Sequence, residues 1–235
     1  MNYQKLAEQF YQDGYLVIEN FFDAVLMGKY NRRILEHFGK TPEFLHNNEF
    51  LSKASTEVIP WFPQREGELM FDEVEQNEKL NALTQAILGN NWYSQYSMVM
   101  FSKQGTKGQA WHQDCPPEIP EQFNMNRLVY TMDINDDTGG LTKVVPGSHR
   151  LGLLPAGDNT VQAFDNEVTL RPKAGTLVLL HGHCWHKVTK VTGSYRVSTN
   201  YRSAPQGTPE NITDICVYSN MRYQFSTSKV VEQRV

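Results

Sequence analysis

The chain has 235 residues, of which 40% are hydrophobic and 20% charged, and its formal net charge is -4. This length and composition are typical of one globular domain with a sizeable core, so we predict a single domain over residues 1–235. There is no basic excess to neutralise a phosphate backbone, which argues against nucleic acid as a partner.

Targeting and disulfide signals are also missing from the sequence. No run approaches 18 apolar residues and the first residues carry no basic stretch before an apolar core, so we expect no membrane span and no signal peptide. Cys115, Cys184 and Cys216 are an odd number of cysteines at wide spacings, which argues against a disulfide framework or a zinc finger. A reducing cytoplasm is the expected location.

The first third of the chain is predicted to be mainly helical. Leu6 and Phe10 stand at helical spacing, and Gly14 follows them as a stop signal. The same signals predict helices over residues 2–13, 23–39 and 73–88, a short β-strand over 15–18, and a short helix with an irregular loop within 40–68.

The remainder is rich in short β runs separated by glycine and proline. The predicted strands are 92–103, 127–134, 141–145, 167–170, 176–180, 185–191 and 195–201. Residues 136–150 are predicted to form a hairpin around an Asp-Gly-rich turn, with His149 as a structural residue of its Pro-Gly turn. This order predicts a mainly β protein with helices, in which a double-stranded β-helix (jelly roll) is flanked by N-terminal helices.

One tetrapeptide, Trp111-His112-Gln113-Asp114, places an imidazole and a carboxylate two positions apart. On a β-strand these two side chains project from the same face. They are two of the three ligands of the facial triad that holds non-haem Fe(II) and leaves coordination positions open. An isolated His-x-Asp also occurs by chance, so a third ligand is needed.

Downstream segments supply candidates for that third ligand and for a cosubstrate clamp. An apolar strand leads into His181, His183 and His186, and one of these could be the third ligand while the others are structural. Arg196 follows on the next predicted strand. A guanidinium there could bind the far carboxylate of a dicarboxylate cosubstrate, or it could be an ordinary structural arginine.

Taken together, these segments resemble the phytanoyl-CoA dioxygenase family of Fe(II)/2-oxoglutarate oxygenases. The resemblance begins at residues 11–22, which look like the opening helix and strand of that family. It continues through residues 111–114 and the Pro-Gly-Ser-His of 146–149, and it ends with Trp185-His186 and Arg196. It covers about residues 8–205, and the ordered occurrence of these pieces is more specific than any one of them.

The resemblance implies a set of site residues and cofactors. His112, Asp114 and His186 would be the iron ligands, and Arg196 would bind 2-oxoglutarate. His183 remains a rival to His186. The cofactors implied are Fe(II), 2-oxoglutarate as cosubstrate, and O2.

Two further positions bear on the cosubstrate pocket. Gln113 lies within the His-x-Asp motif and could assist near the cosubstrate. Val129 occupies a position where the family often has a tryptophan, so this wall of the pocket departs from the family pattern.

The activity implied is hydroxylation of an unactivated C–H bond in a small metabolite or natural-product intermediate, with release of succinate and CO2. Related halogenases have Gly or Ala in place of the carboxylate, so Asp114 favours hydroxylation or another oxidation, such as desaturation or demethylation. The chain has no dense Lys/Arg cluster for the phosphates of coenzyme A, which favours a smaller substrate. The candidate substrate-binding residues are Trp61, Arg65, Phe123 and Tyr201.

Two other functions are compatible with the motifs. One is a jelly-roll protein that binds metal as a sensor or scaffold without catalysis. The other is a cupin-like isomerase or dioxygenase that needs no 2-oxoglutarate. The intact set of His112, Asp114, His186 and Arg196 argues against both. The sequence does not indicate an oligomeric state.

Overall fold

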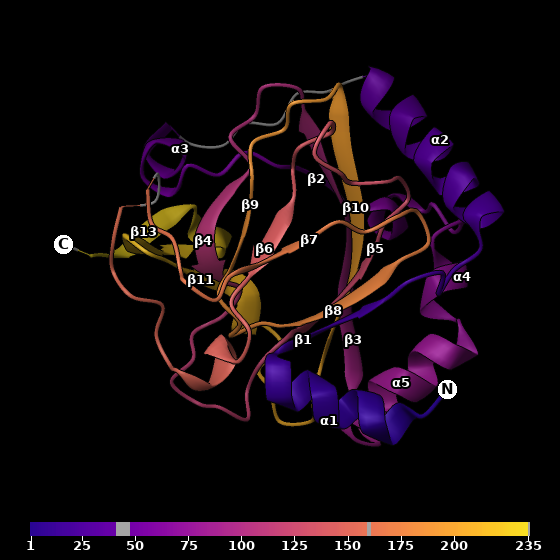
Figure 1. The fold of residues 1–235 in the computed structure, drawn as a ribbon, viewed down its shortest axis with the longest axis horizontal. Helices are drawn as coiled ribbons and strands as arrows, with labels where there is room; N and C mark the ends of the chain where they lie inside the picture. The colour runs from indigo at the N-terminus through magenta and orange to yellow at the C-terminus, as the bar shows by residue number, and fades with distance from the viewer. Residues whose placement is uncertain (41–47, 159–160, 235) are drawn as a thin grey trace.

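The computed structural model describes residues 1–40, 48–158 and 161–234. Two antiparallel sheets lie face to face, and α1, α2, α4 and α5 lie on the outer side of one of them (Figure 1). We call this the helix-covered sheet, and its strand order is β1-β8-β5-β10-β3-β2. The second sheet has the order β13-β12-β11-β4-β9-β6-β7. The predicted jelly roll flanked by N-terminal helices is therefore confirmed.

The helices begin and end at the predicted signals, with one exception. The helices are α1 (Tyr3–Asp13), α2 (Ala24–Lys40), α3 (Asn48–Ala54), α4 (Asp72–Glu75) and α5 (Glu78–Leu88). The single helix predicted over 73–88 is wrong, because it is two helices separated near Asn77. The Asn77 side chain accepts a hydrogen bond from the Leu80 N–H, and this N-cap starts a new helix.

The helix-covered sheet alternates its side chains between the two layers of the core. Its strands are β1 (Tyr15–Ile18), β2 (Ile59–Trp61), β3 (Tyr93–Lys103), β5 (Met125–Val129), β8 (Leu177–His181) and β10 (Tyr195–Ala204). On β8, Leu177 and Leu179 pack against the helices, whereas Val178 and Leu180 face the second sheet. Period-two alternation thus builds one core under the helices and another between the sheets.

The second sheet contains a C-terminal part that the sequence reasoning did not assign. Its strands are β4 (Gln109–Gln113), β6 (Thr142–Val144), β7 (Val168–Leu170), β9 (His186–Val188), β11 (Ile215–Tyr218), β12 (Met221–Gln224) and β13 (Lys229–Gln233). Strand β11 pairs with β4 and so extends the sheet. Phe50 of α3 stacks near Tyr218 and Tyr223 and covers this extension.

The hairpin predicted over residues 136–150 is wrong. Strand β5 pairs with β8 and β10, whereas β6 pairs with β7 and β9 of the other sheet. The Asp-Gly-rich turn is present, but it carries the chain from one sheet to the other. Gly139 and Gly140 have φ angles of +63° and +62°, a conformation that glycine adopts without strain.

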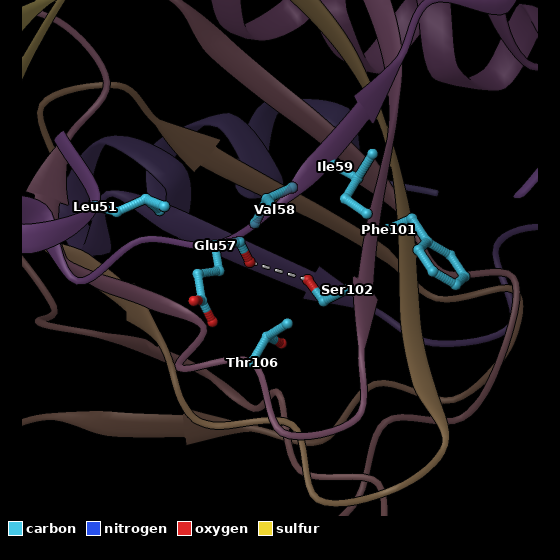
Figure 2. Close-up of a pocket in the computed structure, with 7 residues that line it drawn as sticks. All are labelled: Leu51, Glu57, Val58, Ile59, Phe101, Ser102 and Thr106. Atoms are coloured by element: carbon cyan, nitrogen blue, oxygen red, sulfur yellow. Dashed lines mark hydrogen bonds between the residues drawn. The ribbon is translucent and has the colours of Figure 1, made fainter. Parts of the chain in front are cut away.

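Two other features complete the fold. A small hollow of about 140 Å³ lies beside the edge strand β2, where the Ser102 hydroxyl donates to the Glu57 carbonyl (Figure 2). It contains none of the predicted site residues. Within the described ranges, no helix combines the length and apolar character needed to cross a membrane.

Leu179 tests the placement of the core under the helices. Its side chain is fully buried on β8, so Leu179→Ala should lower the free energy of unfolding by about 2–5 kcal/mol in urea denaturation. Val25→Ala is the control, because Val25 is 69% exposed at the start of α2, and it should change that free energy by less than about 0.5 kcal/mol. Equal effects of the two substitutions would contradict the packing described.

Candidate metal centre

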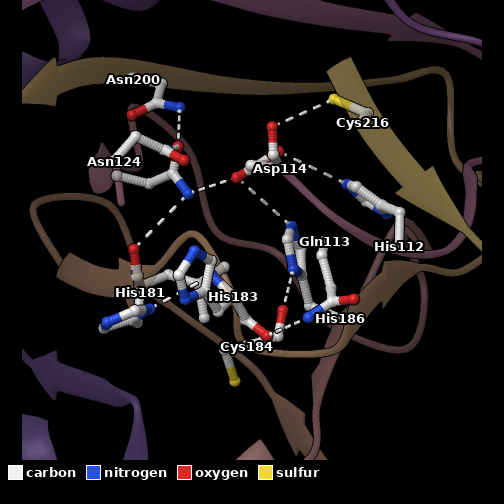
Figure 3. Close-up of polar contacts among 12 residues, drawn as sticks. His112, Gln113, Asp114, Asn124, His181, His183, Cys184, His186, Asn200 and Cys216 are labelled. Atoms are coloured by element: carbon white, nitrogen blue, oxygen red, sulfur yellow. Dashed lines mark hydrogen bonds and ion pairs between the residues drawn. The ribbon is translucent and has the colours of Figure 1, made fainter. Parts of the chain in front are cut away.

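The structure brings His112, Asp114 and His186 together between the sheets. His112 on β4 and His186 at the start of β9 are cross-strand partners, and Asp114 lies two residues after His112. Each residue offers one ligand atom within 4.8 Å of the others, and all three side chains are buried. Figure 3 shows both imidazoles directed toward the Asp114 carboxylate.

Backbone carbonyls select the tautomer of both neutral rings. Nδ1 of His112 lies 2.7 Å from the Ala110 carbonyl oxygen, and Nδ1 of His186 lies 2.8 Å from that of Cys184. A carbonyl only accepts, so each neutral ring carries its proton on Nδ1 and has a lone pair on Nε2. Burial, more than any other influence, lowers the pKa of His112 to about 3, so this ring is neutral at pH 7.

The resulting donor set fits a divalent cation. Nε2 of His112 and Nε2 of His186 each lie 3.8 Å from an oxygen of Asp114, and in the neutral tautomer with the proton on Nδ1 each presents a lone pair to that carboxylate. Lone pairs and a carboxylate that face one another repel unless a cation lies among them. Two neutral imidazoles with carbonyl partners and one carboxylate are the ligands and outer contacts typical of Fe(II) sites.

Two side chains of the helix-covered sheet hold the Asp114 carboxylate. Nη2 of Arg202 donates to Oδ1 over 3.1 Å, and Nδ2 of Asn126 donates to Oδ2 over 2.5 Å. Oδ1 of Asn126 in turn accepts from Asn200 and Arg202. Burial by itself raises the pKa of Asp114, but the Arg202 guanidinium and the hydrogen bond from Asn126 lower it below its ordinary value. Asp114 is therefore an ionised carboxylate with both oxygens in fixed directions.

A cavity of about 550 Å³ opens beside this group. Its wall on the helix-covered sheet includes the inward side chains of β10, with Arg196 at one end of the row and Arg202 at the other. The alternation along β10 predicts that residues 196, 198, 200 and 202 share one face. The sequence reasoning missed Arg202, although it stands in register with Arg196.

Arg196 is buried without a counter-ion. Its Nε donates to the Gly140 carbonyl over 3.0 Å, and its Nη1 and Nη2 donate to the hydroxyls of Ser198 and Thr142. No described carboxylate pairs with it, and the side chain lines the cavity. A buried charge without a partner is costly, so this end of the cavity suits an anionic ligand.

The structure places His183 and Gln113 away from the cavity. The His183 ring packs beside His181 and Phe123, with ring centroids 5.0 and 6.1 Å away. His186, and not His183, therefore joins His112 and Asp114. The Gln113 amide donates to the carbonyls of Gly152 and His183, so its side chain ties two loops together and does not line the cavity.

Of the four predicted substrate residues, one lines the cavity. Arg65 contributes to its wall. Trp61, Phe123 and Tyr201 are buried in the core under the helices. Trp61 stacks on His37 at a centroid distance of 3.9 Å.

Val129 does not line the cavity, although the resemblance assigned its position to a wall of the cosubstrate pocket. Its side chain points toward the helices, and the side chain of its neighbour Leu128 faces the cavity. Other cavity residues that the sequence did not indicate include Tyr96, Met98, Asn126, Asn200, Arg202 and Asp214.

Comparisons with known proteins agree with this fold. An ectoine dioxygenase from Stutzerimonas stutzeri (strain A1501) is 27% identical over 154 residues, in a match that covers 62% of this chain and half of that protein. Among solved structures, the non-heme alpha ketoglutarate dependent epimerase SnoN from nogalamycin biosynthesis superposes with a TM-score of 0.69 at 18% identity. The match covers 89% of this chain and 87% of SnoN.

A second structural neighbour gives the same result. HygX from Streptomyces hygroscopicus, solved with nickel and 2-oxoglutarate bound, has a TM-score of 0.69 at 15% identity. That match covers 86% of this chain and 88% of HygX. The family model described as "Phytanoyl-CoA dioxygenase (PhyH)" matches residues 10–197, which is well over half of the chain. As the resemblance predicted, the chain belongs to the phytanoyl-CoA dioxygenase family.

Proposed function

We propose that this protein is an Fe(II)- and 2-oxoglutarate-dependent dioxygenase that hydroxylates an unactivated C–H bond of a small metabolite or natural-product intermediate. One oxygen atom of O2 enters the substrate as a hydroxyl group. The other enters succinate as 2-oxoglutarate loses CO2. The observation that carries the proposal is the buried His112, Asp114 and His186 group, which shares a cavity with an arginine that lacks a counter-ion.

In this proposal His112, Asp114 and His186 hold the iron. Bound iron would supply the oxidative chemistry, and the protein would supply orientation and a closed site. The ring protons on Nδ1 keep both Nε2 lone pairs directed at one point. Arg202 and Asn126 keep the carboxylate ionised and limit its rotation.

Arg196 would bind the far carboxylate of 2-oxoglutarate. Ser198 and Thr142, which accept from its guanidinium, keep it directed into the cavity. Binding there would give the buried guanidinium the counter-ion that it lacks. The HygX structure with nickel and 2-oxoglutarate bound supports the pairing of a metal with this cosubstrate on this fold.

The first test is turnover of 2-oxoglutarate without substrate. With Fe(II) and O2, the wild-type protein should release succinate slowly. His112→Ala, Asp114→Ala and His186→Ala should each abolish this release and weaken Mn(II) binding in calorimetry, because each substitution removes a ligand. Circular dichroism would confirm that each variant is folded.

The matched control for these variants is His183→Ala. It removes an equally buried histidine that lies outside the group, so Mn(II) binding should persist. Loss of Mn(II) binding in a folded His183→Ala variant, with binding kept in His186→Ala, would show that His183 and not His186 is the third ligand. The absence of any 2-oxoglutarate turnover would favour a protein that binds metal without this chemistry.

Arg196→Ala should act on the cosubstrate and not on the metal. A charge-assisted hydrogen bond contributes about 1.5–3 kcal/mol, so the KM for 2-oxoglutarate should rise roughly 10- to 150-fold. The Mn(II) dissociation constant should change less than about threefold. Equal changes in the two quantities would show that Arg196 is structural.

Gly140 provides a second, independent test of the arginine. A Cβ atom at this position would lie 2.8 Å from Cδ of Arg196, so Gly140→Ala should displace the guanidinium and raise the KM for 2-oxoglutarate roughly tenfold or more. Gly105→Ala is the matched control, because its φ angle is also positive but a Cβ there would meet no atom within 4 Å. A similar KM in the two variants would contradict this role.

A further inference from the structure

The cavity has two ends that can be ordered along the sheets. Arg196 and Arg202 are six residues apart on β10, or about 20 Å along an extended strand. On β6, Thr142 accepts a hydrogen bond from Arg196 and is the cross-strand partner of Val188 on β9. Two residues further along β6, Val144 is the cross-strand partner of His186. The Arg202 side chain donates to Asp114, and Arg202 is the cross-strand partner of Tyr96 on β3. The His-Asp-His group thus lies between an Arg196 end and a Tyr96 end.

Two charged side chains of the cavity remain for a substrate. The charged side chains that line the cavity, apart from the histidines, are Arg65, Asp114, Arg196, Arg202 and Asp214. Arg202 is paired with Asp114, and Arg196 is assigned above to the cosubstrate. Arg65 and Asp214 remain, and neither side chain forms a hydrogen bond or ion pair with any residue of the described ranges.

Arg65 lies beside Tyr96, and Asp214 follows a residue that contacts Tyr96. The guanidinium of Arg65 lies 4.4 Å from the centre of the Phe62 ring and 5.9 Å from that of Tyr96, so stacking holds it in place. Asp214, half-buried in the 3-10 helix η3 (Ile212–Asp214), follows Thr213, whose hydroxyl is 3.2 Å from the Tyr96 hydroxyl. One free cation and one free anion therefore share the end of the cavity away from Arg196.

The wall next to this end is apolar. Asn200 on β10 has two cross-strand partners, Met98 on β3 and Leu128 on β5. The side chains of both partners line the cavity. Leu180 extends the same surface on β8. A ligand whose charged groups lie near Tyr96 would thus pass a hydrocarbon portion along this surface toward the His-Asp-His group.

We propose that the substrate is a zwitterionic small molecule with a carboxylate, an ammonium group and an apolar carbon portion, as in an apolar amino acid. Its carboxylate binds Arg65, its ammonium group binds Asp214, and its hydrocarbon portion lies along Met98 and Leu128. This assignment rests on the proposed function above. An acyl coenzyme A would bring several phosphates to a cavity end with a single free arginine, and a simple anion would leave Asp214 without a partner.

A panel of compounds with matched charges tests the proposal. Valine, leucine, isoleucine, methionine, proline and phenylalanine are each supplied as the free amino acid, the N-acetyl acid, the amide and the N-acetyl amide. The readouts are succinate release above the uncoupled rate and the gain of one oxygen atom by the compound. At least one free amino acid should stimulate release, and blocking either charge should raise the concentration required about tenfold.

Two variants assign the two charges separately. Arg65→Gln should weaken the response to compounds that carry a carboxylate and leave the response to the amides unchanged. Asp214→Asn should weaken the response to compounds that carry an ammonium group and leave the N-acetyl acids unchanged. Arg32→Gln and Glu66→Gln are the controls, because both residues are exposed, as Arg65 is, but neither lines the cavity.

Several outcomes would overturn the assignment. An N-acetyl acid or an amide that is as effective as its free amino acid would show that only one charge is recognised. Failure of every free amino acid to stimulate release would exclude the class as stated. Uncoupled succinate release by the wild-type protein distinguishes these results from failure of the proposed function, in which no release occurs at all.

Discussion

The buried carboxylate of Asp114 is the group on which the rest of the site depends. Its position just after β4 places it on the second sheet, but Arg202 and Asn126, which hold it, belong to the helix-covered sheet. Burial of a lone carboxylate costs several kcal/mol, and these contacts offset that cost only when the two sheets stand at the correct separation. The same contacts therefore stabilise the sandwich and orient the candidate metal ligand.

The sequence predicted the parts of the site that depend on local geometry. The i, i+2 spacing of His112 and Asp114 was sufficient to place both on one face of a strand. The residues alone left the third histidine open, because His186 meets His112 only through the pairing of β4 with β9. Arg202 and Asn126 act through contacts between the two sheets. The alternation along β10 places Arg202 on the face of Arg196, but no pattern within the strand shows that it meets Asp114.

The same distinction explains the errors in the fold and in the substrate residues. Caps and glycine stops predicted the helix ends, because those signals are local. The hairpin over 136–150 had the correct turn residues, but its flanking strands pair with distant partners in different sheets. Trp61, Phe123 and Tyr201 were selected as aromatic residues near the expected pocket. All three belong to the core under the helices. Their residue type did not indicate this, because it does not reveal which face of the sheet a side chain occupies.

The hydrogen bonds from the two imidazoles to carbonyls have a consequence for metal choice. Each ring is tied to the carbonyl oxygen two residues earlier in its own chain segment, so its orientation is set by the strand and not by an ion. Neither ring has to turn when a metal arrives, and the arrangement offers the same donors to any first-row divalent ion. Affinity for such ions rises from Mn²⁺ to Cu²⁺ for a given set of ligands. These donors alone would therefore not select iron over other divalent ions, and metal availability would contribute to which ion is bound.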